Sequence, residues 1–125
     1  MLSNIATVLA GPIGAGTILM GARAFWAPQA AVGFGIPDTP TKDPSFHAWL
    51  SVKGMRDIAS GLFIIILLAG GTTHLLGWFL PAASAIPVGD AVIVLRSNGP
   101  KTAAYGIHGA TAVVMPAISE LLLVA

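Results

Sequence analysis

Seven polar side chains that could take part in chemistry lie inside segments that are otherwise apolar. They are Lys53, Arg56, Asp57 and Ser60 in the segment 47–70, Asp90 in the segment 74–95, and Tyr105 and His108 in the segment 101–124. Carboxylates, a histidine and basic side chains together permit general acid and base catalysis, because burial and neighbouring charges tune their proton affinities. On a helix, the four residues of the first segment fall within one arc of roughly 100°. Placing an ionisable group inside a membrane costs free energy, so such a group by default indicates a binding or catalytic site.

The composition indicates a single integral membrane domain covering residues 1–125. Hydrophobic residues make up 55% of the chain against 9% charged, and the mean hydropathy is +0.85. A water-soluble domain of this length would have too little polar surface to cover such a core. The net charge is +1 with six Lys and Arg in all, so the chain has no basic surface for nucleic acid.

Four apolar segments, each long enough to cross a bilayer, predict an all-α fold. They are residues 2–23, 47–70, 74–95 and 101–124, about 20 to 24 residues each. The residues between the first two, 24–46, contain four prolines and predict a loop, because proline interrupts a helix. Its apolar first half, 30–36, is expected either in the membrane interface or folded back as a lid. With short later connections, the simplest arrangement is an antiparallel four-helix bundle.

The basic residues predict how this bundle is oriented in the membrane. An even number of spans places both termini on one side and the loops 24–46 and 96–101 on the other. The residues Arg23, Lys42, Arg96 and Lys101 all lie on the loop side, and the opposite side has no Lys or Arg. The positive-inside tendency therefore predicts cytosolic loops, with both termini in a lumen or outside the cell.

Counting along the helices brings the ionisable groups of three segments to nearly one level. From the nearest loop the count is six residues for Asp90, seven for His108, and six to ten for Lys53 to Asp57. At 1.5 Å per residue, all lie roughly 10 to 15 Å below the loop side. We therefore expect one polar site, with catalytic residues Arg56, Asp57, Asp90 and His108 and substrate-binding residues Lys53, Trp49, Ser60 and Tyr105.

The same residues also have a structural explanation. Lys53 and Asp57 have the spacing of a helical i,i+4 ion pair. Arg56 could tie its helix to Asp90, and His108 could form a hydrogen bond across the bundle. Hydrogen bonds inside membranes contribute about 0.6 kcal/mol on average, so five ionisable groups are costly if they serve packing alone. This cost favours a binding or catalytic site.

No metal and no cofactor are predicted. The three histidines are dispersed without HxxH or HExxH spacing, and the chain has no cysteine. Any acid and base chemistry would therefore be carried out by the side chains themselves.

A stripe of mostly small residues lies along the first segment, made of Thr7, Gly11, Gly14, Ala15, Ile18 and Ala22. Small residues let another helix approach closely. The partner helix could belong to the same chain or to a second copy in a homo-oligomer, and the sequence leaves both open.

Four strings of residues resemble the small membrane family called domain of unknown function 4267. They are FWAPQAAVGFGIP, KGMRDIASGLF, PVGDAVIVL and GIHGATAV, and they occur in the family's order between about Arg23 and Leu123. The resemblance implies a four-helix membrane protein in which Arg56, Asp57, Asp90 and His108 are the motif positions. Some members resemble accessory proteins of natural-product pathways, which favours an enzyme or a substrate-handling role.

Three functions follow as hypotheses. The first is a cofactor-free acid-base enzyme of the isomerase or cyclase type that acts on a lipophilic small molecule drawn from the lipid bilayer. The second is a non-catalytic lipid-binding or ligand-binding protein, or an accessory membrane subunit. The third is a small proton or ion transporter, for which four helices are few.

Overall fold

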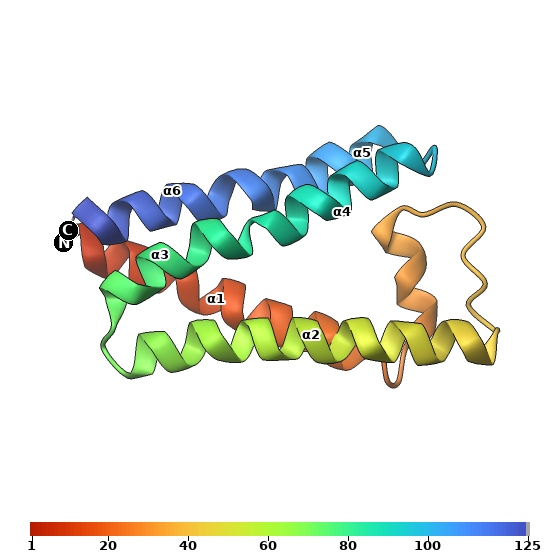
Figure 1. Ribbon diagram of the computed structural model, residues 1–125, viewed down its shortest axis with the longest axis horizontal. Coiled ribbons are helices and arrows are strands. Elements are labelled where there is room, and N and C mark those ends of the chain that lie inside the picture. Colours follow the sequence, from red (N-terminus) through yellow and green to blue (C-terminus); the bar gives the residue numbers. More distant parts are fainter. Residues whose placement is uncertain (125) are drawn as a thin grey trace.

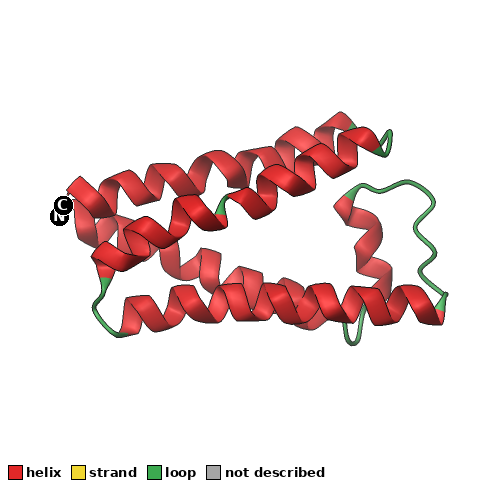
Figure 2. Cartoon of the chain, viewed as in Figure 1, coloured by secondary structure: helices red, strands yellow, loops and turns green. Residues whose placement is uncertain are grey.

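The computed structural model describes residues 1–124, without the side chain of Ser3. Within these residues all regular structure is helical, and no strand occurs. The elements are α1 (Leu2–Arg23), the 3-10 helix η1 (Pro28–Phe34), α2 (Pro44–Ala69), α3 (Thr73–Ala83), α4 (Ala85–Arg96), α5 (Lys101–Ala103), the π-helix η2 (Ala104–Gly109) and α6 (Ala110–Val124). The connections between them are shown in Figure 2.

The helices form two pairs that meet at one end and diverge at the other (Figure 1). α1 packs along α2, and the column α3–α4 packs along the column α5–η2–α6. Near the termini α1 also contacts α6, and α2 contacts α3. At the opposite end η1 lies between the two pairs (Figure 1).

The second helix begins at Pro44 rather than at His47. Asp43 caps it, because its carboxylate accepts a hydrogen bond from the backbone N–H of Ser45 at 3.0 Å. Pro44 occupies the first helical position, where its missing N–H costs nothing. The last proline of the predicted loop, Pro44, is therefore the first residue of α2, and the loop is shorter than predicted.

The loop predicted over 24–46 contains the short helix η1, which the sequence did not predict as a helix. Pro28 starts it, and Gly35 ends it with a positive φ of 107°. The apolar half of the loop is thus ordered and folded back against the helices.

Both of the later predicted helices are interrupted. The segment 74–95 breaks at Ser84, whose hydroxyl donates to the carbonyl of Pro81 at 2.6 Å. The segment 101–124 opens into the π-helix η2, where each turn takes in more residues than an α-turn. An interruption of this kind changes which residues share one side of a helix. Counting residues along a straight helix does not include this change.

Glycines set the distance between α1 and α2. A Cβ at Gly61 would lie 2.5 Å from the carbonyl oxygen of Gly14, and one at Gly54 would lie 2.5 Å from that of Gly21. Because both pairs are seven residues apart, the two helices approach backbone to backbone over two turns. Gly14 belongs to the stripe of small residues predicted in the sequence, whereas a Cβ at Gly11 would meet nothing within 4 Å. In this chain the contact is made within one molecule.

A hydrophobic core fills the end where all helices meet. It is made of the buried residues Ala6, Ala10, Ile64, Leu76, Leu80, Met115, Ile118 and Leu122. Ser119 lies beside it and donates a hydrogen bond to the carbonyl of Gly77 across α3 and α6. This end therefore holds the two pairs together.

Three helical segments are long and apolar enough to cross a membrane: Asn4–Arg23, Thr73–Arg96 and Lys101–Val124. α2 is longer than any of them, but every stretch of 18 residues within it includes Lys53, Arg56 and Asp57. The outer surface is apolar, with large side chains such as Trp78 and Val113 exposed by 63% and 71%. These features are consistent with a membrane protein, because lipid would cover such a surface.

The glycine contact leads to a test of stability. We expect Gly61→Ala to lower the free energy of unfolding by about 1 to 3 kcal/mol, because the added methyl meets backbone that can move only if α1 shifts. Thermal unfolding in a mild detergent would measure this. The matched control is Gly16→Ala in α1, where a Cβ meets nothing within 4 Å, so the substitution should be neutral or stabilising. Equal melting temperatures for the two variants would contradict the assignment.

Candidate functional site

A cavity of about 770 Å³ lies between the two helical pairs, at the end where they diverge. Its volume is within the usual range for small-molecule sites, which is roughly 300 to 1,000 Å³. The residues that line it come from the end of α1 (Met20, Arg23, Ala24, Ala27), from η1 and the loop after it (Ala30, Ala31, Gly33, Phe34, Ile36, Pro37, Asp38, Thr39, Pro40), from α2 (Phe46, Leu50, Lys53, Gly54, Asp57), from α4 (Asp90, Ile93) and from η2 (Ile107, His108). The wall is mostly apolar, with four ionisable groups from three elements in its deeper part.

The first two of these groups form an ion pair on α2. The ammonium nitrogen of Lys53 lies 2.7 Å from a carboxylate oxygen of Asp57, one turn further along the helix. The side chain of Asp57 is 17% exposed and that of Lys53 is 42% exposed. The Lys53–Asp57 pair therefore satisfies its own charge and leaves the ammonium accessible from the cavity. This contact confirms the i,i+4 pair predicted from the spacing.

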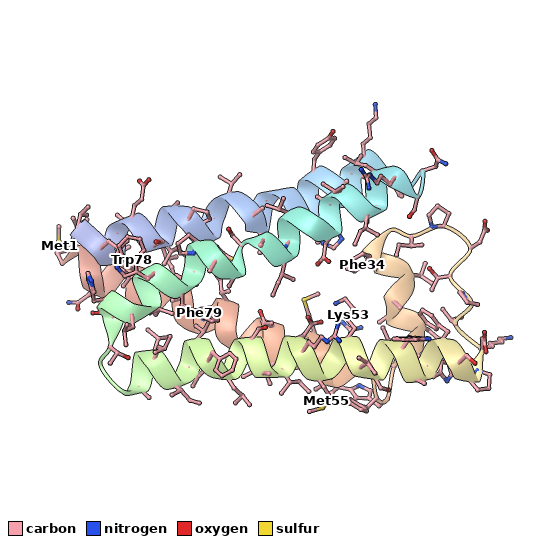
Figure 3. The ribbon with its side chains drawn as sticks, viewed as in Figure 1. Met1, Phe34, Lys53, Met55, Trp78 and Phe79 are labelled. Carbon is pink, nitrogen blue, oxygen red and sulfur yellow. The ribbon has the colours of Figure 1, made fainter. Side chains whose placement is uncertain are left out.

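Phe34, at the end of η1, lies between the charged groups of the two walls. The Lys53 nitrogen is 5.3 Å from the centre of its ring, which is within range of a cation–π contact. On the other side its ring lies 4.3 Å from the ring of His108, at an angle of 49°. Figure 3 shows Lys53 extending from α2 toward Phe34, whereas Met55 points away from the cavity.

The hydrogen bonds of His108 determine its tautomer. Its Nε2 lies 2.9 Å from the backbone carbonyl oxygen of Phe34, and a carbonyl can only accept, so Nε2–H is the donor. The other ring nitrogen, Nδ1, lies 3.8 Å from a carboxylate oxygen of Asp90. These two side chains, the Asp90–His108 pair, place a ring nitrogen and a carboxylate oxygen next to each other at the cavity wall.

The turn after η1 fixes Phe34 in this position. At Gly35 a Cβ would lie 2.8 Å from the Cβ of Ala103 and 3.1 Å from a methyl of Val94. Val94 and Ala103 form a small core with Ala104, against which Phe34 packs. The segment η1 is therefore fastened to the wall that carries Asp90 and His108.

Four predicted site residues do not line this cavity. Arg56 and Ser60 lie on α2 outside it, and the Ser60 hydroxyl donates to the Arg56 carbonyl at 2.9 Å. Trp49 is 74% exposed and Tyr105 is 60% exposed. The structure brings together Lys53, Asp57, Asp90 and His108, and it leaves Arg56, Ser60, Trp49 and Tyr105 on the outside.

The π-helix explains the position of Tyr105. On an α-helix Tyr105 and His108, three residues apart, would lie near each other on one face. In η2 the wider turn separates them, so His108 is buried while Tyr105 is exposed. π-turns of this kind are frequent at functional sites.

The glycine contacts also correct the depth expected for the site. Because Gly21 is opposite Gly54 and Gly14 is opposite Gly61, Arg23 lies level with Val52 and Ile18 level with Asp57. The residues 44–52 of α2 therefore extend beyond the end of α1. Asp57 lies five residues below that end, about 7 to 8 Å, which is shallower than the count from His47 indicated.

Phe34 and Arg23 line this site without being predicted as site residues. Phe34 lies in the predicted loop 24–46, and Arg23 is one of the basic residues that predict the orientation in the membrane. A signal for the first was the sequence GFG at 33–35, because a large ring between glycines suggests close packing around a turn. No local pattern indicated that the loop returns to His108.

A family model matches residues 14–123, which is most of the chain and includes the whole cavity. Its description is Domain of unknown function (DUF4267). The chain belongs to this family. Comparison with curated proteins and with solved structures gives no significant match. The family thus confirms the resemblance found in the sequence, and the site must be interpreted from its own chemistry.

Metal binding has no support from the side chains of the described residues. Among them no group of three His, Asp or Glu side chains lies close enough to hold a metal ion. The Asp90–His108 pair has two such ligands only, and the nearby Lys53 would repel a cation.

The docking of η1 can be tested at Gly35. We expect Gly35→Ala to release residues 28–43, because its φ of 107° is strained for alanine and the added methyl collides with Ala103. Hydrogen exchange of this segment should become several-fold faster or more. Gly33→Ala is the control, since Gly33 is outside the positive-φ glycines and its Cβ would meet nothing within 4 Å. If both variants exchange like the wild type, the contact does not hold η1.

Proposed function

We propose that this protein crosses the membrane four times as an antiparallel bundle. The three apolar segments support three crossings. α2 would be the fourth, because it packs along the whole of α1 and turns Lys53 and Asp57 toward the cavity rather than toward lipid. Arg56 lies about a turn below the level of Arg23, close enough for its long side chain to reach the headgroups.

The proposed orientation places the loops 24–46 and 96–101 in the cytosol and both termini outside or in a lumen. The basic residues of the loop side support this orientation. Trp26 and Trp49 are also exposed near the loop side, as is usual for aromatic residues at a membrane interface.

Absence of cysteine in the chain allows a direct test of this orientation. In sealed vesicles with the cytosolic face outward, a membrane-impermeant maleimide should label Lys42→Cys and leave Thr72→Cys unlabelled until detergent is added. The reverse pattern would mean that the bundle is inverted. Labelling of both without detergent would contradict four crossings.

We further propose that the protein is an acid-base enzyme that acts on a lipophilic small molecule. The observation that carries the proposal is that a mostly apolar cavity contains the Asp90–His108 pair and, across from it, the Lys53 ammonium. A proton acceptor and a positive charge on facing walls are what proton transfer next to a carbonyl requires.

In the proposed reaction the Asp90 carboxylate removes a proton from a carbon beside a carbonyl group of the substrate. The electron pair moves onto the carbonyl oxygen, and the Lys53 ammonium stabilises the resulting enolate. Asp57 holds the Lys53 ammonium in place through the ion pair. Transfer of a proton from the Asp90 carboxyl group, after exchange with solvent, to a different carbon restores the carboxylate and completes the isomerisation of a double bond. Lys53, rather than the predicted catalytic residue Arg56, would supply the positive charge.

Phe34 has two parts in this proposal. Its carbonyl fixes the Nε2–H tautomer of His108, so that Nδ1 faces Asp90. Its ring separates the two charged pairs and excludes water from the space between them. Asp90 and His108 can then exchange protons with a substrate in a medium of low polarity.

A second candidate is a non-catalytic ligand-binding protein or accessory subunit. The observation in its favour is that the Lys53–Asp57 pair and the His108–Phe34 contact already satisfy most of the polar groups. In that case the cavity would hold a molecule without changing it. The close glycine contact is made within one molecule, so it does not support a homo-oligomer.

Hydrogen isotope exchange distinguishes the enzyme from the binder. The lipophilic compound that copurifies in mild detergent is identified by mass spectrometry and then incubated with the protein in D₂O. We expect the wild type to introduce deuterium into it, and Asp90→Asn to reduce the rate by about 10²-fold or more. Glu120→Gln, on the outer surface at the far end of α6, should leave the rate unchanged. A compound that binds tightly and gains no deuterium would favour the ligand-binding alternative.

A further inference from the structure

Arg23 lies at the mouth of the cavity, at the end of α1. It lines the same space as the catalytic groups, and it is exposed to it. Its guanidinium forms no ion pair with any described residue. Among the described residues it is therefore the basic side chain of the cavity wall whose charge is not balanced by an ion pair, since Lys53 is paired with Asp57.

The level of Arg23 fits a ligand that has one charged end. The register of α1 and α2 places Arg23 about 7 to 8 Å above Asp57 along the helix axis. Between them the wall is formed by Met20 and Gly54, which are apolar or small. A molecule lying along this wall would have its head at Arg23 and its apolar body beside the two charged pairs.

We infer that the cavity takes an amphiphile with an anionic oxygen head, a carboxylate or a phosphate, and that Arg23 binds this head. Arginine is suited to the role, because its planar fork donates two parallel hydrogen bonds to a carboxylate or a phosphate. The inference names the substrate class of the proposed enzyme and rests on that function only in using the same cavity, because it needs binding and not turnover.

Other charges around the cavity are consistent with a head at this position rather than deeper. In the lower part Asp57 and Asp90 offset the positive charge of Lys53, so an anion gains less there than at Arg23. Asp38 lines the loop side and belongs to an exposed turn, where water screens its charge. The anionic head is therefore stabilised at Arg23, where it also stays near the aqueous boundary.

A set of probes with one chain and different heads tests this. Dodecanoate, dodecyl phosphate and dodecanol are titrated onto the protein in a neutral detergent, and binding is followed by tryptophan fluorescence, since Trp26 lies three residues from Arg23. We expect at least one of the two anions to bind tenfold or more tightly than the alcohol. A preference for only one of them would identify the head as a carboxylate or as a phosphate ester.

The variant Arg23→Gln should lose about tenfold in affinity for the preferred anion and keep the affinity for dodecanol, which shows that the cavity is still folded. Arg96→Gln is the matched control, an exposed arginine at the end of α4 that does not line the cavity, and it should bind like the wild type. Equal binding of alcohol and anions by the wild type, or an unchanged anion preference in Arg23→Gln, would overturn the inference.

The isotope experiment separates this inference from the proposed function. Anion preference without deuterium exchange would overturn the enzyme and leave the role of Arg23 supported. Deuterium exchange without anion preference would overturn the role of Arg23 and leave the enzyme supported.

Discussion

The contact of Phe34 with both walls of the cavity is the constraint on which the rest of this structure depends. Its ring touches Lys53 on one side and His108 on the other, and its carbonyl accepts the hydrogen bond of His108. The two helical pairs meet in a hydrophobic core near the termini. At the other end a segment of seven residues separates them, which leaves a cavity where helices would otherwise pack against each other.

Charge balance is the second organising feature. In a chain with 9% charged residues, four ionisable groups that line the cavity occur as two pairs, one within α2 and one between α4 and η2. Pairing lowers the cost of keeping these groups away from water. The glycine contacts of α1 and α2 set the level of the first pair, since they fix the register of the two helices. Packing and chemistry are thus coupled through Gly21 and Gly54.

The sequence predicted the helical segments, but it did not predict where they are interrupted or which way every site residue faces. Apolar segments of about 22 residues predicted helical structure, because length and hydropathy depend on neighbouring residues alone. The breaks at Ser84 and in η2 were not predicted, since length and hydropathy do not indicate where a helix departs from regular α-helical hydrogen bonding. The site residues show the same difference between local spacing and the assembled fold. Lys53 and Asp57 are neighbours on one turn, whereas the outward positions of Arg56 and Tyr105 depend on how α2 and η2 are rotated in the assembled fold.

The sequence by itself determined the all-helical class, the apolar character of three segments, the family and the i,i+4 pair on α2. All of these are set by residue type and short spacing. The tertiary structure alone decided that η1 enters between the helical pairs, that Phe34 selects the tautomer of His108, and that Arg23 joins the cavity. Residues 34 and 108 are far apart in the chain, and only the path of the folded backbone brings a carbonyl and an imidazole within hydrogen-bonding distance.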